Sequence, residues 1–285
     1  MMPTTVFAQI SRRCNLQCVM CGYEAWSRNT GFMSDEVFDR VIEQMREHGI
    51  GRLALTAAQG EPLLAPKAIP FINRAISASL DAHINTNCTP LSPRIIRELA
   101  TAATTGQLTI QCSFSGYDKE SYERIYVGAD FEKTAAKLRE LNWTFAAFDR
   151  ERDITVRGVV YSQADEARTM QFIQSLGICR ERISLTYPDN FAGLVNDGKS
   201  LRPGFETMTL HMCPWLTDYV VVYDDGKVSA CACRDSEGVM AIGNIMTQSL
   251  AEMRGGEAYQ STVAAFNAKN IAHLPLCAKC DVPYS

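Results

Sequence analysis

The chain has 285 residues, of which 46% are hydrophobic, and its formal net charge at pH 7 is −4. This length supports one large domain, or a large domain with a small appendix. The acidic balance argues against a nucleic-acid partner, because proteins that bind nucleic acids carry a basic surplus. No apolar run reaches the roughly 18 residues of a membrane span, and residues 1–10 lack the features of a secretory signal. We therefore expect a cytoplasmic protein without a membrane partner.

Up to about residue 190, short apolar runs alternate with helical stretches. In chain order, we expect a strand at Val6–Ile10, a helix at Ser34–His48, a strand at Arg52–Thr56, a helix at Pro66–Ser79, a strand at Ala82–Asn85, a helix at Pro93–Thr104, a strand at Leu108–Ser113, helices from Lys119 and at Phe131–Leu141, a strand at Ile154–Tyr161, a helix at Glu166–Leu176 and a strand at Ile183–Thr186. This alternation predicts parallel strands joined by right-handed crossovers. The fold class is thus α/β, a partial (βα)6 TIM-like barrel over residues 1–190.

The sequence changes character after residue 190. Residues 191–207 fall in a stretch rich in Gly, Asn and Asp, which predicts a linker or lid. Residues 208–285 form a small, Cys-rich module with an expected hairpin of Tyr219–Tyr223 and Lys227–Ala230, which turns at Asp224-Asp225-Gly226. A helix is expected at Gly256–Ala268.

Eleven cysteines in a reducing compartment suit metal binding or catalysis better than a disulfide framework. Cys14, Cys18 and Cys21 form a C-x3-C-x2-C triplet on the loop after the first strand, where active groups of parallel sheets lie. Thiolates are soft ligands that suit iron–sulfur clusters, and three of them leave one iron open to a substrate. The alternatives are a structural zinc site completed by a distant histidine, or buried thiols.

A second group of cysteines lies in the C-terminal module. Cys213 and Cys231 flank Gly226 in a C-x12-G-x4-C pattern, and Cys277 and Cys280 follow as C-x2-C. The glycine permits a turn that brings Cys213 near Cys231. Four cysteines can close one iron–sulfur cluster, although they bind zinc equally well.

The first triplet resembles the signature of the radical S-adenosylmethionine (radical SAM) superfamily, and the barrel pattern agrees with it. The resemblance implies a [4Fe–4S] cluster whose open iron binds S-adenosyl-L-methionine (AdoMet). One electron then cleaves the sulfonium and yields a 5′-deoxyadenosyl radical. Met20 stands where the family usually has an aromatic residue before the third cysteine.

The resemblance also implies residues that contact AdoMet. Gln59-Gly60-Glu61-Pro62 is similar to the family's Gly-Gly-Glu element, so Gly60 and Glu61 are expected at the methionine amino group. Ser113 and Ser115 resemble the ribose-contacting position, and Arg157 is expected at the cofactor carboxylate. A turn glutamate, strand-end caps and an outward-facing arginine are the alternatives.

The C-terminal module resembles the twitch module, a shortened relative of the SPASM domain, and Gly243-Asn244-Ile245, followed by a helical stretch, agrees with it. This resemblance implies one auxiliary [4Fe–4S] cluster. Among the remaining cysteines, Cys112 and Cys179 are expected to be small core residues, and Cys88 is expected to fill the core or a loop. Cys233 lies two residues after Cys231, and its S–H group is a candidate hydrogen-atom donor in an epimerase. It is otherwise a bystander, or a ligand in place of Cys231.

Twitch enzymes that this chain resembles include dehydrogenases and epimerases of aminoglycoside and aminocyclitol pathways. We therefore favour epimerisation of a hydroxylated small molecule of the aminoglycoside, sugar or nucleoside type, in antibiotic or natural-product biosynthesis. Dehydrogenation of a secondary alcohol, with the auxiliary cluster as electron acceptor, is one alternative. Maturation of ribosomal peptides and a non-enzymatic electron-transfer role are others. A flavodoxin- or ferredoxin-type protein or a chemical reductant is the expected electron source.

Acidic residues near the expected opening are candidates to attract a polyamine substrate. They are Asp189, Asp218, Asp224 and Asp235.

Overall fold

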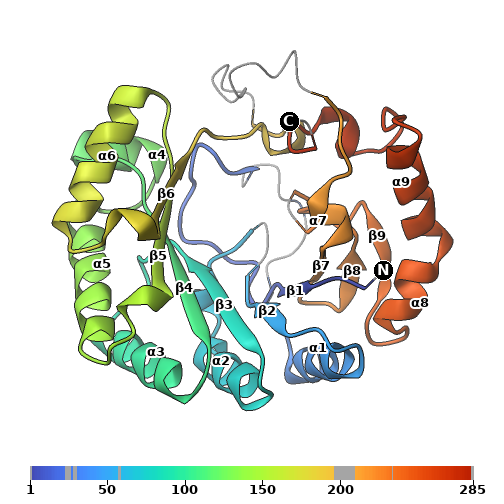
Figure 1. Cartoon of the computed structure of the whole chain (residues 1–285), viewed down its shortest axis with the longest axis horizontal. Helices are drawn as coiled ribbons and strands as arrows, with labels where there is room; N and C mark the ends of the chain where they lie inside the picture. The colour runs from blue at the N-terminus through green and yellow to red at the C-terminus, as the bar shows by residue number, and fades with distance from the viewer. Residues whose placement is uncertain are drawn as a thin grey trace.

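The computed structural model describes residues 2–22, 27, 31–56, 59–195, 209–232 and 234–283. Within these ranges, nine strands form one sheet in the order β6-β5-β4-β3-β2-β1-β7-β8-β9 (Figure 1). The strands are β1 (Thr5–Ala8), β2 (Arg52–Ala54), β3 (Asp81–Thr86), β4 (Leu108–Ser113), β5 (Ile154–Val159), β6 (Ile183–Thr186), β7 (Tyr219–Val222), β8 (Lys227–Ser229) and β9 (Ala241–Asn244).

Helices cover the outer side of the barrel strands, whereas α8 and α9 lie on the opposite side of the molecule (Figure 1). The α-helices are α1 (Asp35–Glu47), α2 (Ala68–Ser77), α3 (Pro93–Thr105), α4 (Lys119–Ile125), α5 (Phe131–Ala146), α6 (Gln163–Ser175), α7 (Pro214–Thr217), α8 (Leu250–Gly255) and α9 (Glu257–Asn267). In the described part of the chain, no helix has the length and apolar character needed to cross a membrane.

Strands β1 to β6 pair in parallel with their neighbours, and the sheet is not closed. This arrangement confirms the predicted α/β partial barrel. Strands β4 and β6 have the predicted bounds, whereas β1 and β5 end two residues early. Because the pairing is parallel, the carboxyl ends of all six strands meet at one edge of the sheet.

The helix α1 shows how local chemistry sets an element. The Ser34 side chain accepts a hydrogen bond from the Val37 backbone at its amino end, and Asp35 and Glu36 lie in the first turn, where negative charge is favoured. Its buried Phe38 stacks on Phe71 of α2, with ring centroids 4.1 Å apart. The helix therefore combines a capped start with an aromatic anchor in the core.

The C-terminal module continues the barrel sheet. Strand β7 pairs in parallel with β1, with Phe7 opposite Val221. The Asp218 carbonyl accepts hydrogen bonds from the backbones of Thr4 and Thr5, at 2.8 and 3.2 Å, and so extends the pairing. The predicted hairpin is confirmed, because β7 and β8 are antiparallel around the Gly226 turn. The β1–β7 pairing was not predicted, since it joins segments more than 200 residues apart.

The helix α1 also contacts the module. The buried Gln44 side chain accepts a hydrogen bond from the Leu250 backbone at the start of α8, at 2.8 Å, and Arg40 donates to the Ile245 carbonyl at 3.1 Å. Strand β9 and the short helix α7 were not among the expected elements, whereas α8 is the helical stretch expected after Gly243-Asn244-Ile245. The two unexpected elements have six residues or fewer, so periodicity gives little signal.

The structure sorts the leftover cysteines. Cys88 and Cys112 are buried in the core, as expected. The prediction for Cys179 is wrong, because its side chain is exposed and accepts a hydrogen bond from Arg182. The preceding residue, Ile178, enters the core instead.

Replacing Phe38 with alanine should destabilise the protein by about 3–5 kcal/mol, because the change leaves a cavity against Phe71. Denaturant unfolding followed by circular dichroism would measure the loss. Trp143→Ala is the control, since that side chain is 64% exposed and should give a much smaller change. Equal losses in both variants would contradict the packing argument.

Candidate active site

The first cysteine triplet lies on the loop that leaves β1. Cys14, Cys18 and Cys21 are half-buried. The loop contacts the end of α4 and the segment that follows it, because the backbones of Gln17 and Val19 donate to the Val127 and Ile125 carbonyls, both at 3.0 Å. These bonds hold the triplet against the barrel.

The thiols of this triplet interact electrostatically. Burial raises the pKa of Cys18 well above its usual value, and the charges of Cys21 and Cys14 raise it further. Burial also raises the pKa of Cys14. The three thiolates therefore repel one another, and a cationic cluster that binds all of them removes this repulsion. The chemistry of the donor set thus fits an iron–sulfur cluster.

The second group of cysteines behaves in the same way. Burial raises the pKa of Cys213 to about 11, and Cys231 contributes through its charge. Burial raises the pKa of Cys277 to about 12, with further contributions from Cys231 and Cys213. Cys280 ends the same short turn as Cys277, and its backbone donates to the Cys277 carbonyl at 3.3 Å. The fold therefore brings the predicted four cysteines into one region.

A single-ion site is a separate question. Across the described residues, no group of three or more His, Cys, Asp or Glu side chains is arranged to hold one metal ion.

Gly60 and Glu61 brace the start of the first cysteine loop. Gly60 has a φ of +93°, and a Cβ atom there would overlap the Ser11 carbonyl oxygen. The Glu61 backbone donates to the Arg13 carbonyl at 2.7 Å. Glycine is required here because the two backbones touch and the conformation is left-handed.

The Glu61 carboxylate points into the protein. It is 2% exposed, and it accepts hydrogen bonds from Thr86 Oγ1 at 2.8 Å and from the backbones of Asn87 at 2.7 Å and Leu63 at 3.1 Å. Burial raises its pKa to about 7, although these three donors act to lower it. Asn87 in turn places its side-chain nitrogen 3.9 Å from Cys14 Sγ. Glu61 thus connects the end of β3 to the cysteine loop.

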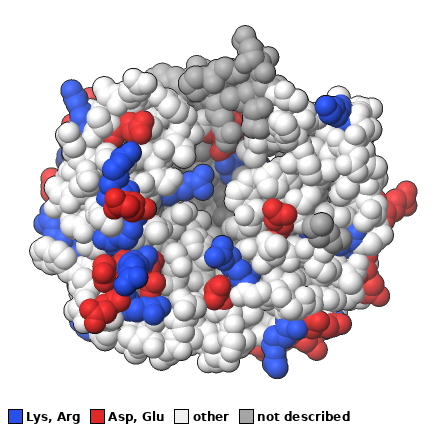
Figure 2. Space-filling model, viewed as in Figure 1, with Lys and Arg blue, Asp and Glu red and all other residues white. Residues whose placement is uncertain are grey.

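A cavity of about 790 Å³ lies at the carboxyl ends of the barrel strands. Figure 2 shows the molecule hollowed between the barrel and the module, with Lys and Arg side chains around the hollow. Residues from five strands line it: Phe7, Asn85, Ser113, Arg157 and Thr186. This volume lies within the roughly 300–1,000 Å³ of typical small-molecule sites.

Cys21 of the first group, and residues next to cysteines of the second group, line this cavity. Met20 and Cys21 line it from the first loop, and Trp215, Ala232, Arg234 and Val282 line it from the module. Trp215 and Ala232 follow Cys213 and Cys231 by two residues and one residue, and Val282 follows Cys280 by two. The cavity is therefore lined both by the first cysteine loop and by residues that neighbour the auxiliary cysteines in sequence.

The expected AdoMet contacts fall into two sets. Ser113 and Arg157 line the cavity. Ser115 is fully buried; its Oγ lies 3.1 Å from the Tyr126 hydroxyl and accepts from the Val159 backbone at 2.7 Å. Cys233, the expected hydrogen-atom donor, lies outside the described residues.

The four acidic residues do not form an open acidic rim. Asp235 is 2% exposed and accepts hydrogen bonds from Ser229, Val239 and Met240 inside the hairpin. Its expected role at the opening is therefore wrong, because a carboxylate so enclosed fixes the fold of its own segment. Of the four, Asp189 lines the cavity, and it is paired with Arg234.

Two features of the cavity were missed by the sequence reasoning. Phe7, Trp215 and Tyr219 form an aromatic cluster, with Phe7 and Trp215 on the cavity wall and ring centroids 5.9 Å apart. The Asp189–Arg234 pair closes another side. Both depend on contacts between distant segments, so local sequence gave no signal for them.

Comparison with known proteins agrees with this geometry. Residues 8–145 match the radical SAM superfamily, and residues 213–281 match an iron–sulfur cluster-binding domain, SPASM. The chain therefore contains a radical SAM domain and a SPASM/twitch-type auxiliary domain. Its cofactors are AdoMet with its [4Fe–4S] cluster, and an auxiliary iron–sulfur cluster.

Two solved structures share the fold over nearly the whole chain. The crystal structure of BtrN in complex with AdoMet and 2-DOIA has a TM-score of 0.66 and 17% identity, and covers 98% of this chain and 93% of that chain. Streptococcus suis SuiB bound to precursor peptide SuiA has a TM-score of 0.75 and 13% identity, and covers 99% of this chain and 70% of that chain.

Curated relatives match over shorter lengths. The AdoMet-dependent heme synthase of Methanosarcina barkeri is 25% identical over 65% of this chain, and the PqqA peptide cyclase of Granulibacter bethesdensis is 27% identical over 64%. The matches span 51% and 47% of these relatives. For the tungsten-containing aldehyde ferredoxin oxidoreductase cofactor-modifying protein of Pyrococcus furiosus, the span is 27%.

Replacing Gly60 with alanine should lower reductive cleavage of AdoMet roughly tenfold or more. The added Cβ would overlap the Ser11 carbonyl and strain the backbone by more than about 1 kcal/mol, so the first cysteine loop would have to move. The assay is 5′-deoxyadenosine formation, with iron content measured in parallel. Gly51→Ala is the control, since nothing lies within 4 Å of its added Cβ. Normal cleavage by the Gly60 variant would show that the contact with Ser11 is dispensable.

Glu61 should make the stability of the protein depend on pH. Its pKa is raised from 4.5 to about 7 in the fold, so the folded state retains a proton that the unfolded state has released between these values. Stability should therefore fall by roughly 3 kcal/mol as the pH rises through this window. Glu61→Gln should remove this dependence, as measured by denaturant unfolding at about pH 5 and about pH 7.5. The exposed Glu132→Gln should behave as wild type, and an unchanged slope in the Glu61 variant would refute the assignment.

Proposed function

We propose that this enzyme abstracts a hydrogen atom from a small hydroxylated substrate that binds in the cavity between its two clusters. Cys14, Cys18 and Cys21 would hold the AdoMet-binding cluster, and the auxiliary cluster would be held by Cys213, Cys231, Cys277 and Cys280. The observation that carries the proposal is a single cavity lined by residues next to both cysteine groups. When bound, the first cluster and AdoMet supply the 5′-deoxyadenosyl radical.

The residues toward AdoMet would have different tasks. Ser113 and Arg157 line the cavity, so they can contact the ribose and the carboxylate of the cofactor. Gly60 allows close approach of the backbone to the cysteine loop. Glu61 and Ser115, both buried and hydrogen-bonded to protein groups, would act by fixing the walls rather than by direct contact.

The cavity chemistry favours a polar molecule with an apolar face. Phe7 and Trp215 offer aromatic surface, while Asn85, Ser113 and Thr186 offer groups that hydrogen-bond hydroxyls. A volume of about 790 Å³ that must also receive AdoMet leaves room for a substrate of modest size. An aminoglycoside-, sugar- or nucleoside-type compound of a natural-product pathway meets these conditions.

Epimerisation is the outcome that we propose first. Ala232 and Arg234, the sequence neighbours of Cys233, both line the cavity. In the proposed step, the Cys233 S–H bond breaks as a new C–H bond forms on the opposite face of the substrate radical. One electron from a flavodoxin- or ferredoxin-type protein, or from a chemical reductant, and one proton from water then restore the thiol.

Dehydrogenation is the second candidate, because three residues that lie one or two positions after an auxiliary cysteine line the cavity: Trp215, Ala232 and Val282. A substrate radical beside a hydroxyl would lose an electron to the auxiliary cluster and a proton to water, and would become a ketone. BtrN, which matches over the length of both chains, was crystallised with AdoMet and 2-DOIA.

Peptide modification is a third candidate. SuiB was crystallised with its precursor peptide, and one curated relative is a peptide cyclase. A peptide would have to insert one side chain into the cavity while the rest of it lies outside. Such a substrate would protect a wide surface from hydrogen exchange, whereas a small molecule would protect the cavity walls alone.

Replacing Cys233 with alanine should preserve 5′-deoxyadenosine formation and abolish the inverted product. Turnover in deuterated water is the measurement, since a thiol exchanges with solvent and should deliver deuterium to the inverted carbon. Cys179→Ala is the matched control, because that exposed thiol precedes β6 and so lies at the opposite edge of the sheet from the cavity. A carbonyl product without deuterium would instead establish dehydrogenation, and retained inversion would exclude Cys233 as the donor.

A further inference from the structure

The ion pair between Asp189 and Arg234 joins the end of the barrel to the auxiliary module. Arg234 Nε donates to Asp189 Oδ1 at 2.8 Å, and Nη2 pairs with Oδ2, so the ion pair is bidentate. The side chains are 17% and 18% exposed, and both line the cavity. Water and salt therefore screen this pair less than a pair on the open surface.

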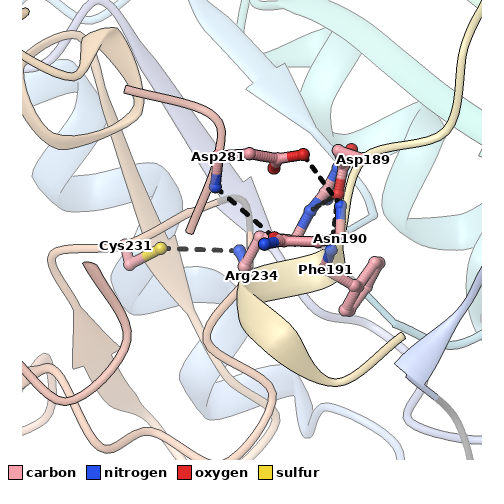
Figure 3. A network of polar contacts seen from close by, with 6 residues as sticks. All are labelled: Asp189, Asn190, Phe191, Cys231, Arg234 and Asp281. Atoms are coloured by element: carbon pink, nitrogen blue, oxygen red, sulfur yellow. Dashed lines mark hydrogen bonds and ion pairs between the residues drawn. The ribbon is translucent and has the colours of Figure 1, made fainter. Parts of the chain in front are cut away.

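Arg234 is held close to an auxiliary-cluster cysteine. Its backbone N–H donates to Cys231 Sγ at 3.4 Å. Its guanidinium lies over the Phe191 ring, 4.4 Å from the centroid. Figure 3 shows the Arg234 backbone joined to Cys231 and the Arg234 side chain joined to Asp189. The guanidinium is therefore held by Asp189 and the Phe191 ring rather than free to move into solvent, and it belongs to a residue whose backbone contacts the cysteine.

The segment that carries Asp189 also contacts the other half of the auxiliary cysteine set. Asp189 accepts a hydrogen bond from the Phe191 backbone at 2.9 Å, which orients its carboxylate. Asn190 donates from its backbone to Asp281 at 3.0 Å and from its side chain to the Lys279 carbonyl at 2.7 Å. Lys279 and Asp281 flank Cys280. Asp189 is thus anchored to the region around both pairs of cysteines.

We propose that Asp189 is a positioning residue for the auxiliary cluster. Its carboxylate compensates the positive charge of Arg234, whose backbone contacts Cys231, and thereby lowers the reduction potential of that cluster. The physical basis is that net charge, and hydrogen bonds to the sulfurs, set the potential of an iron–sulfur cluster. An uncompensated positive charge stabilises the reduced form and raises the potential. The inference concerns the cluster itself, so it holds whether the substrate is epimerised, oxidised or a peptide.

This charge argument fixes the sign of each shift. Asp189→Asn removes the negative charge that pairs with Arg234 and should raise the midpoint potential of the auxiliary cluster. Arg234→Gln removes the positive charge that pairs with Asp189 and should lower it. The double variant restores the net charge and should return close to the wild-type value. Each single change should alter the one-electron equilibrium roughly tenfold, which corresponds to about 59 mV.

The test is an anaerobic redox titration of the holoprotein, followed by electron paramagnetic resonance, with iron content measured for every variant. The first cluster serves as an internal reference whose potential should stay constant. Asp153→Asn is the matched control, because it breaks the pair with Arg150 at 2.6 Å and similar exposure, away from the cysteines. Asp189→Glu keeps the charge and should retain the wild-type potential.

Opposite shifts in the two single variants, cancelling in the double variant, would establish the proposal. Shifts in the same direction, or no shift, would overturn it, because a purely structural role predicts similar damage from either side of the pair. If Asp189→Asn lost its auxiliary cluster, Arg234→Gln would decide alone. A potential at or above the wild-type value in that variant would refute the charge argument.

Discussion

The arrangement of the site depends on β1, the strand that pairs in parallel with β2 on one side and with β7 on the other. The first cysteine loop leaves this strand, and the hairpin that β7 starts leads to Cys231. Because one strand supports both segments, the first cysteine loop and residues next to the auxiliary cysteines line the same cavity. A separate module on a flexible linker would not fix the distance between two clusters in this way.

Around this frame, backbone contacts hold the cysteine loops. Gly60 touches the Ser11 carbonyl, and Glu61 bonds to Arg13, Thr86 and Asn87. The Glu61 carboxylate is therefore buried within the protein and is not part of the cavity lining. Burial raises the pKa values of Cys18, Cys213 and Cys277, and the charges of neighbouring cysteines raise them further. Binding of a cation would remove this repulsion between thiolates.

Local sequence signals predicted most of the barrel. Strands β4 and β6 matched their expected bounds, and α1 and α3, capped by Ser34 and Ser92, begin within one residue of their expected starts. The helix α5 runs to Ala146, five residues beyond the prediction, because Asn142 and Phe145 are buried against neighbouring elements. The prediction that Cys179 lies in the core is wrong, since Ile178 takes the buried position after Gly177 and the next side chain, Cys179, is exposed. Tertiary packing decided these last two cases.

The sequence by itself determined the chemistry: the spacing of seven cysteines, the glycine before Glu61 and the βα alternation define a radical SAM enzyme with an auxiliary cluster. These features are local, so short stretches of chain carry them completely. The tertiary structure alone decided what surrounds the cavity. The β1–β7 pairing, the aromatic wall of Phe7 and Trp215, and the Asp189–Arg234 pair all join residues far apart in the chain. Their contacts follow from packing of the whole fold, which no single stretch of sequence specifies.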